Sequence, residues 1–377
     1  MNMAYIQSIE INDFRGIRKL AISDLSNINL VVGDNNSGKT TFLEAIQLLY
    51  AEPSLGSIMN VISQRTLLRP DITSFYTSFI KMFNKEQTKE QLGFDIYATG
   101  RREALEFELS GNERIISGDE AFKISSISPS QKTHMKRTLK GIPETAKLFS
   151  GRVVAGREHN AVDTKIRITS LDDGTTAPTK GKSVYYLPSF GHLRFDLLQN
   201  IVNNPDYKKL AISVLKQFDD SIEDICFTKT DDGAYLETVI TNNNVNMPFS
   251  VYGDGIKKIL YILNKLFEAS DSILMIDEIE TGLHKKYYDM LFPVIFALAN
   301  KLSVQLFIAT HSIEAIEAIL KYGDYDKNDK RDSDDPIRVI TLRKIQSDGE
   351  SSNIVARNVS GKYVYENRKV FEFEVRL

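Results

Sequence analysis

Residues 33–40 read GDNNSGKT, between the apolar run INLVV at 28–32 and the segment TFLEAI at 41–46. An apolar run, a glycine-bounded loop with G-x-x-x-x-G-K-T and a helical segment are typical of a phosphate-binding loop. Backbone N–H groups of such a loop surround phosphate oxygens, and the helix N-terminus adds partial positive charge. Lys39 adds a full charge, and the Thr40 hydroxyl can hold Mg²⁺. We therefore expect a nucleotide site here; a glycine and asparagine turn that merely caps a helix is the alternative. The expected nucleotide contacts are Gly33, Asn35, Asn36, Ser37, Gly38, Lys39, Thr40 and Thr41.

The composition is that of an ordinary globular chain. It has 377 residues, of which 42% are hydrophobic and 26% charged, with a net charge of −3. This length suits one large α/β domain with an inserted lobe, or two domains. The chain has no overall positive charge that would indicate a nucleic-acid partner. The single cysteine, Cys226, excludes an internal disulfide and a cysteine-based zinc site. No apolar run approaches the ~20 residues of a membrane span, so we expect a cytoplasmic protein without a membrane partner.

Apolar runs at 28–32, 272–276 and 303–309, each followed by a helical or turn segment, predict a buried parallel sheet. Because the first run lies far from the other two, the core is split, and the intervening segment is expected to form an inserted lobe. Helices are expected at 40–50, 193–218 with a break near Pro205, 255–268, 285–301 and 313–320.

Elsewhere the pattern predicts mainly strands and loops. A first strand within 3–11 and a second at 20–22 flank a turn, 92–98 and 104–109 form a hairpin, and 222–227, 234–241 and 245–251 form a three-stranded meander. Residues 111–130 are polar and turn-rich, and 131–149 predict a helix with Lys132, Lys136, Arg137 and Lys140 on or beside one face. Two last strands, near 337–345 and 353–359, precede a tail.

Two further strand ends carry residues suited to phosphate chemistry. The run ILMI at 273–276 ends in Asp277 and Glu278, and the run ending at 309 is followed by Thr310 and His311. At the carboxyl end of a parallel strand, Asp277 would lie beside the phosphate loop and order Mg²⁺. Glu278 could polarise a water molecule against the γ-phosphate, and His311 could donate a hydrogen bond to it. An acidic helix cap and an ordinary loop histidine are the alternatives.

A second glycine loop, SVYGDG at 250–255, opens the helix at 255–268. It could bind a phosphate through the helix N-terminus. One chain has no evident need for two γ-phosphate loops, whereas two chains that face each other do. A strand-to-helix turn is the structural alternative.

Together these motifs resemble an ABC-type ATPase of the SMC and overcoming-lysogenization-defect (OLD) kind. The resemblance covers roughly 1–50 and 220–320. It implies an α/β fold: an ABC-type P-loop NTPase head with a mixed or parallel core sheet, an antiparallel β subdomain and an inserted helical lobe. On this basis we expect residues 1–50 and 220–377 to form the ATPase head and 51–219 the inserted lobe.

The resemblance also implies roles for single residues. Lys39 and Thr40 match the Walker A positions, Asp277 the Walker B aspartate that serves the metal, and Glu278 the catalytic glutamate. Ser250, Gly253 and Gly255 match the signature loop, which in this family completes the site of a second subunit. ETGLH at 280–284 resembles the dimer-contacting loop, His311 the switch histidine, and Arg15 the basic residue that approaches nucleotide. ATP, Mg²⁺ and a homodimer or higher homo-oligomer are therefore implied.

Three departures from the family narrow the function. The signature is not LSGGQ, which argues against a transporter subunit, and no long heptad arm is present. Because 66 residues follow His311 (377 − 311), the nuclease domain of OLD enzymes is expected to be missing. The leading hypothesis is an ATPase that controls a separate nuclease or toxin in anti-phage defence. A repair ATPase that binds DNA through the basic stretch at 131–140 is the alternative, and a slow ATPase used as a scaffold is a third.

Overall fold

The computed structural model describes residues 4–66, 75–101, 103–125, 143–172, 184–193, 197–243, 245–326, 334–345 and 353–371. The basic stretch predicted at 131–140 lies outside these residues. None of the described helices is long and apolar enough to cross a membrane.

The core is a six-stranded sheet in the order β15-β14-β3-β13-β12-β8. All neighbouring strands are parallel except β14 and β15, which are antiparallel. Every residue of β3, β12 and β13 is buried, which accounts for their mainly apolar sequences. The predicted split parallel core is thus confirmed. The strands are β3 (Ile28–Val32), β8 (Val184–Leu187), β12 (Ile273–Ile276), β13 (Gln305–Thr310), β14 (Ile337–Ile345) and β15 (Asn353–Ser360).

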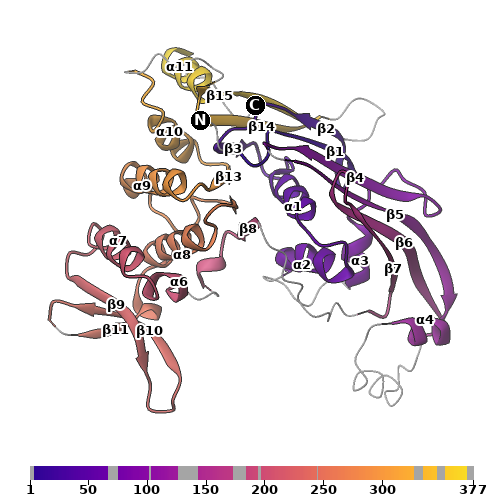
Figure 1. Cartoon of the computed structure of the whole chain (residues 1–377), viewed down its shortest axis with the longest axis horizontal. Helices are drawn as coiled ribbons and strands as arrows, with labels where there is room; N and C mark the ends of the chain where they lie inside the picture. Colours follow the sequence, from indigo (N-terminus) through magenta and orange to yellow (C-terminus); the bar gives the residue numbers. More distant parts are fainter. Residues whose placement is uncertain are drawn as a thin grey trace.

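Helices cover both faces of this sheet (Figure 1). Leu274 and Ile276 of β12 pack in a cluster with α8, α9 and α10, whereas Ile273 and Met275 pack in a second cluster with α1. Alternate residues of a strand point to opposite faces, so one short strand serves both layers. The helices are α1 (Lys39–Leu49), α8 (Asp254–Glu268), α9 (Tyr288–Lys301) and α10 (Ile313–Lys321), with the 3-10 turn η3 (Lys285–Tyr287) before α9.

Helix α1 also packs against a second sheet, which is antiparallel with the order β2-β1-β4-β5-β6-β7. The predicted hairpin of β4 and β5 is confirmed. Two predictions in this sheet are wrong: residues 111–117 continue β5 and α4 follows, where turns were expected, and residues 145–149 open β6 rather than a helix. Both segments are strands because β5 pairs with β6 from Leu105 to Ser117, and this long-range pairing overrides the local sequence pattern. The elements are β1 (Ser8–Phe14), β2 (Ile17–Ile22), α2 (Leu55–Thr66), α3 (Phe75–Ile80), β4 (Leu92–Thr99), β5 (Ala104–Ser117), α4 (Gly118–Ile124), β6 (Thr145–Arg157) and β7 (Val162–Thr169).

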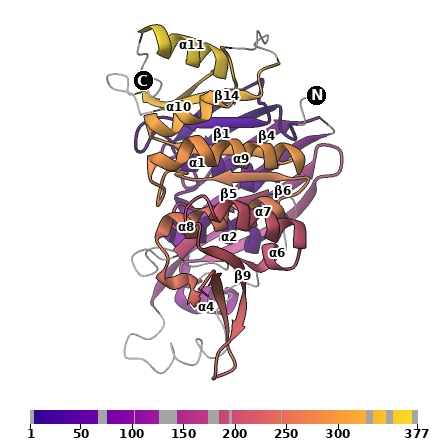
Figure 2. The same cartoon turned by 90° about the vertical axis from the view of Figure 1, so that its left-hand side faces the viewer.

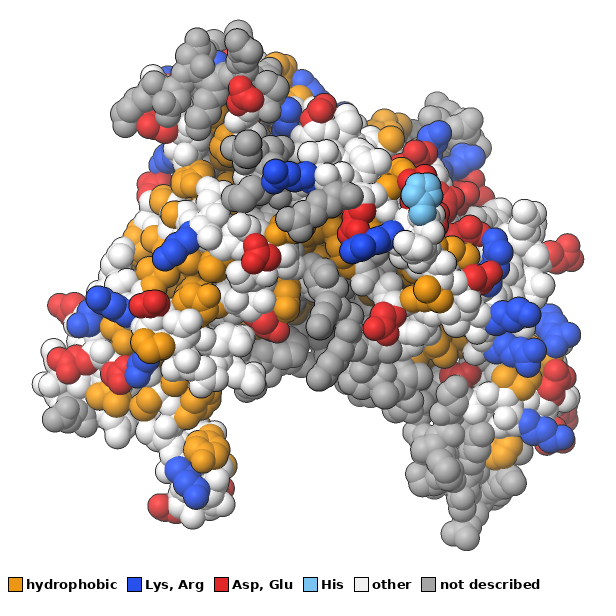
Figure 3. All heavy atoms as spheres, in the orientation of Figure 1, with side chains coloured by type: hydrophobic (Ala, Val, Ile, Leu, Met, Phe, Trp, Pro, Cys, Tyr) orange, Lys and Arg blue, Asp and Glu red, His pale blue; other side chains and the backbone are white. Residues whose placement is uncertain are grey.

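A small third sheet, ordered β11-β10-β9, confirms the predicted meander and projects from the body beside α7 and α8 (Figures 1 and 2). Hydrophobic side chains gather on it (Figure 3), and Phe227, Tyr235 and Leu236 are exposed there. The third strand is shorter than expected, because Phe249–Val251 form a 3-10 turn, η2. The elements are α6 (Gln199–Val202), α7 (Pro205–Leu215), β9 (Ile222–Lys229), β10 (Tyr235–Thr241) and β11 (Asn246–Pro248).

The boundaries predicted for the two regions stay a prediction. Strand β8, from the predicted inserted lobe, pairs with β12 in the core sheet. Strands β1 and β2, from the predicted head, pair in the same sheet as β4–β7. After β15 the chain forms helix α11 (Gly361–Phe371), where only a tail was expected.

Gln305, at the start of β13, joins the N-terminal segment to the core. Its side-chain oxygen accepts hydrogen bonds from the backbone N–H groups of Tyr5 and Ile6, both at 2.9 Å. Its amide nitrogen donates to the carbonyl oxygens of Ile6, at 2.8 Å, and Ser26, at 2.9 Å. One buried side chain thus satisfies four backbone groups in segments about 300 residues away.

Candidate functional site

The predicted phosphate loop, residues 33–40, lies between β3 and α1. Gly33 and Gly38 have φ angles of 145° and 102°, and Asn36 has 65°, so the backbone turns through conformations that favour glycine or asparagine. A Cβ atom at Gly33 would collide with the carbonyl oxygen of Leu342 in β14. The loop therefore needs glycine at its first position for both conformation and space.

Lys39 lies within the curl of this loop. Its Nζ donates hydrogen bonds to the carbonyl oxygens of Gly33, at 2.7 Å, and Asp34, at 2.8 Å. Burial lowers the pKa of Lys39, and the nearby carboxylates of Asp277, Glu280 and Glu278 oppose that shift. The loop thus holds a positive charge at its centre, opposite a group of carboxylates.

Thr40 and Asp277 meet across the core sheet. The Thr40 hydroxyl donates a hydrogen bond to Oδ2 of Asp277 at 3.0 Å, and the Tyr186 hydroxyl donates to the same oxygen at 2.9 Å. Tyr186 lies in β8, which pairs with β12 on the side away from β13. Parallel pairing brings the strand ends to one edge, which places the aspartate beside the loop.

Glu278 follows directly and has a φ of 48°, an unusual conformation for a residue other than glycine. Its Oε2 accepts a hydrogen bond from the Thr281 hydroxyl at 3.2 Å. Such outliers are concentrated at functional sites, where surrounding structure holds them. Glu278 lines the same cavity as Asp277.

His311 lies against Glu280 rather than against the phosphate loop. Its backbone N–H donates to Oε1 of Glu280 at 2.9 Å, and its Nδ1 lies 3.0 Å from that oxygen. Among the described residues that line the cavity, Asp277 and Glu278 are present and these two are not. The structure therefore joins the ends of β12 and β13 through a histidine and a glutamate.

Arg15 sits at the turn between β1 and β2 and reaches the cavity from the second sheet. Its Nε lies 2.8 Å from Oε2 of Glu44, a buried residue of α1. Its φ is 54°, and its backbone N–H donates to the carbonyl oxygen of Met82 at 2.7 Å. The guanidinium is thus held at the cavity wall by an ion pair.

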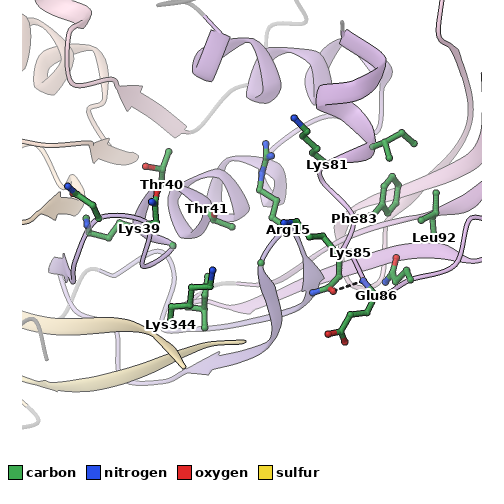
Figure 4. A pocket seen from close by; sticks show the side chains of 18 of the residues that line it. Arg15, Lys39, Thr40, Thr41, Lys81, Phe83, Lys85, Glu86, Leu92 and Lys344 are labelled. Atoms are coloured by element: carbon green, nitrogen blue, oxygen red, sulfur yellow. Dashed lines mark hydrogen bonds between the residues drawn. The ribbon is translucent and has the colours of Figure 1, made fainter. Parts of the chain in front are cut away.

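One cavity of about 1190 Å³ contains most of the predicted site. Figure 4 shows Lys39 and Thr40 at one end of it and Arg15 near its middle. The predicted residues that line it are Arg15, Asn35, Asn36, Gly38, Lys39, Thr40, Thr41, Asp277 and Glu278.

The second glycine loop lies apart from this cavity. Ser250 is exposed in the 3-10 turn before α8, Gly253 is the residue that precedes the first turn of α8, and Gly255 lies within that turn. None of the three lines the cavity as described. A Cβ atom at Gly253 would meet nothing within 4 Å. In one chain Ser250 and Gly253 are therefore exposed, whereas Gly255 is half-buried beside the carbonyl oxygen of Gly282.

Sequence reasoning missed Tyr186 and Lys258. Lys258 of α8 is fully buried, and its Nζ donates to the carbonyl oxygen of Ser189 at 2.9 Å. Burial lowers its pKa to about 8, opposed by the carboxylates of Glu280, Asp277 and Glu278. The sequence did contain a signal for this burial. Tyr261 and Ile262, three and four residues after Lys258, lie on the same face of the helix and are buried.

Comparison with known proteins finds relatives of this chain. A relative from Helicobacter pylori, "ATP/GTP phosphatase", is 25% identical over 333 residues, which cover 83% of this chain and 87% of that protein. A shorter match, 44% identical over 45 residues, covers 12% of this chain and 13% of the DNA replication and repair protein RecF of Idiomarina loihiensis.

Among solved structures, the Smc head domain with an extended coiled coil from Pyrococcus furiosus, bound to the C-terminal domain of ScpA, is similar. It has a TM-score of 0.50 and 10% identity, covering 98% of this chain and 100% of that chain. At this identity the likeness concerns the fold, and it supports the ABC-type head expected from the sequence. The model of one family matches residues 28–317, most of the chain. The protein belongs to that family, which is described as "AAA domain, putative AbiEii toxin, Type IV TA system".

Proposed function

We propose that this protein binds and hydrolyses ATP, closes as a homodimer or higher oligomer around it, and thereby controls a separate effector. One observation carries the nucleotide site: a glycine loop centred on Lys39 and the Thr40–Asp277 hydrogen bond share one cavity. Support also comes from the AAA-domain family and from the phosphatase named in Helicobacter pylori.

The residues present fit a nucleotide phosphate and a magnesium ion. Lys39 lines the cavity beside Thr40, and its ammonium group is a charged donor suited to a phosphate oxygen. The Thr40 hydroxyl and the Asp277 carboxylate are oxygen donors of the kind Mg²⁺ prefers. When bound, Mg²⁺ would neutralise phosphate charge. Thr40 would hold the ion, and Asp277 would orient the water molecules bound to the ion.

Glu278 is the proposed general base. Its side chain lines the cavity, and its hydrogen bond from Thr281 fixes one carboxylate oxygen while the other can face a water molecule. Glu280 is instead engaged by His311. We assign His311 a sensing role toward the γ-phosphate, which requires this pair to rearrange.

The dimer is proposed because the second glycine loop lies apart from the cavity of its own chain, with Ser250 and Gly253 exposed. Ser250, Gly253 and Gly255 have the sequence of a phosphate-binding helix start, yet they lie outside the cavity of their own chain. A second copy, placed head to tail, would bring them to the phosphate held by the first. Each site would then need residues from two chains.

The effector is proposed from the family description, which names a putative toxin of a toxin–antitoxin system. A nuclease or toxin that the ATPase holds or activates in anti-phage defence is the form we favour. Copurification with the product of the neighbouring gene tests it. If that product is unrelated to nucleases or toxins and does not bind, this part of the proposal fails.

Hydrolysis is tested with Glu278→Gln, using Glu223→Gln, at an exposed glutamate that does not line the cavity, as the matched control. Glu278→Gln should bind ATP, turn it over at most about a hundredth as fast, and accumulate dimer. Wild-type turnover in Glu278→Gln would remove this residue as the base and make Glu280 the candidate.

The composite site is tested by mixing two inactive variants, Lys39→Ala and Ser250→Arg. A mixed dimer keeps one of its two sites with both contributing residues intact. Because about half of the dimers are mixed when equal amounts combine at random, mixing should recover about a quarter of wild-type turnover. If mixing restores nothing while each variant still dimerises, the site is not shared between chains.

A further inference from the structure

The carboxylate of Asp277 is held by two hydroxyl groups that come from different elements. Thr40 of α1 and Tyr186 of β8 both donate to Oδ2, at 3.0 and 2.9 Å. An ionised carboxylate only accepts hydrogen bonds, so both hydroxyl groups are donors. Among the described residues, none donates a hydrogen bond to Oδ1. The side chain is therefore fixed through one oxygen, and the other oxygen is left for a further ligand.

The pairing of β8 with β12 directs Tyr186 toward this oxygen. Tyr186 pairs with Met275, and the backbone N–H of Asp277 donates to the carbonyl oxygen of Leu187 at 2.9 Å, so the contact between the strands continues past the end of β12. Because side chains two residues apart share a face, Asp277 lies on the face of Met275 and therefore of Tyr186. Tyr186 packs against the cluster that contains α1, whereas Tyr185 packs against the cluster of α8 and α9 on the other face.

The backbone that carries Tyr186 is anchored on both sides of the strand pairing. All four residues of β8 pair with β12. Just after the strand, the carbonyl oxygen of Ser189 accepts a hydrogen bond from Nζ of buried Lys258 at 2.9 Å, and the N–H of Gly191 donates to the carbonyl oxygen of Pro188 at 3.0 Å. The hydroxyl group is thus presented by a fixed segment, which lowers the entropy cost of orienting the carboxylate.

We propose that Tyr186 is a positioning residue for Mg²⁺ at the nucleotide site. Thr40 and Asp277 line the cavity, whereas Tyr186 is not among the described residues that line it, so its hydroxyl group acts on a ligand through the carboxylate. By holding Oδ2, it leaves Oδ1 to the water molecules of the ion. Partners of this kind, one step removed from a metal, typically change metal affinity about 10- to 100-fold. The inference rests on the proposed nucleotide site and adds a residue to it.

The test is Tyr186→Phe, which removes only the hydroxyl group, with Tyr185→Phe on the other face of the same strand as the matched control. Fluorescence anisotropy of a labelled, non-hydrolysable ATP analogue is followed while Mg²⁺ is titrated, and the affinity for the same analogue is measured in EDTA. Tyr186→Phe should raise the Mg²⁺ concentration at half-maximal binding at least about tenfold and leave the affinity in EDTA unchanged. Tyr185→Phe should change neither quantity.

The same Mg²⁺ dependence in Tyr186→Phe and in wild type would overturn this inference alone, because wild type would still have its metal-dependent nucleotide site. An equal loss of affinity with Mg²⁺ and in EDTA would also overturn it, since that result indicates a structural role for the tyrosine. So would an equally large effect of Tyr185→Phe, which would indicate a general disturbance of β8. Wild-type protein whose binding of the analogue does not depend on Mg²⁺ would defeat the proposed metal site, and this inference with it.

Discussion

Replacing buried Lys258 by methionine should change how stability depends on pH. The ammonium group is fully buried, and its pKa falls from 10.5 to about 8 because of burial. Below about pH 8 both folded and unfolded chains carry the proton, and the cost of burying the charge is present in full. As the pH rises further, the folded chain releases its proton and the unfolded chain keeps it, so the free energy of unfolding increases.

The magnitude follows from the size of the shift. One pKa unit corresponds to about 1.4 kcal/mol, so the rise totals about 3 kcal/mol when the pH reaches the unfolded pKa, and about 2 kcal/mol of it falls between about pH 7.5 and 9.5. Lys258→Met lacks this rise. Relative to the variant, the wild type should therefore gain about 2 kcal/mol across this range.

Urea unfolding followed by circular dichroism at the two pH values measures this difference. Other groups titrate identically in both proteins, so their contributions cancel. Lys301→Met, which removes an exposed lysine from α9, is the control and should differ from wild type equally at both pH values. If the difference between wild type and Lys258→Met is the same at both pH values, the buried charge inferred from the structure is refuted.

Three further outcomes are expected. Lys39→Ala should weaken ATP binding about 10- to 100-fold by equilibrium titration, since a charged donor is lost; unchanged affinity would contradict the loop assignment. Gly33→Ala should destabilise by more than about 1 kcal/mol in thermal unfolding, because of its φ and its collision with Leu342; an unchanged melting temperature would contradict that reading. Gln305→Met leaves four backbone groups unpaired and should cost at least about 3 kcal/mol in urea unfolding; a loss below 1 kcal/mol would mean that water replaces these bonds.

What could be predicted from the sequence was local. The strand, loop and helix around Lys39 lie within a short span, and the carboxylates after β12 follow from a buried strand that ends at one sheet edge. The helix α8 was visible because its apolar and polar residues separate by face. The site roles of these residues stay predictions, although their placement around one cavity agrees with them.

What could not be predicted depends on partners far along the chain. Residues 111–117 read as turns because their polar side chains carry no strand pattern, but β6 pairs with all of them. Tyr186 reaches Asp277 only because the four-residue strand β8 is added at the edge of the core sheet. From the sequence, Lys257 and Lys258 would both be expected at the surface. In the structure Lys258 is buried and donates a hydrogen bond to the carbonyl oxygen of Ser189.

The pairing of β3 has a consequence for how the chain is made. Both neighbours of this strand, β13 and β14, begin at Gln305 or later. During synthesis at roughly 5–20 residues per second, an apolar strand without hydrogen-bonding neighbours must wait roughly 15 to 55 s after it is made. The antiparallel sheet, complete by Thr169, can meanwhile form and hold α1 against it. Newly made chains should therefore need shielding of β3, by that sheet or by a chaperone, until Gln305 emerges and closes onto Tyr5 and Ile6.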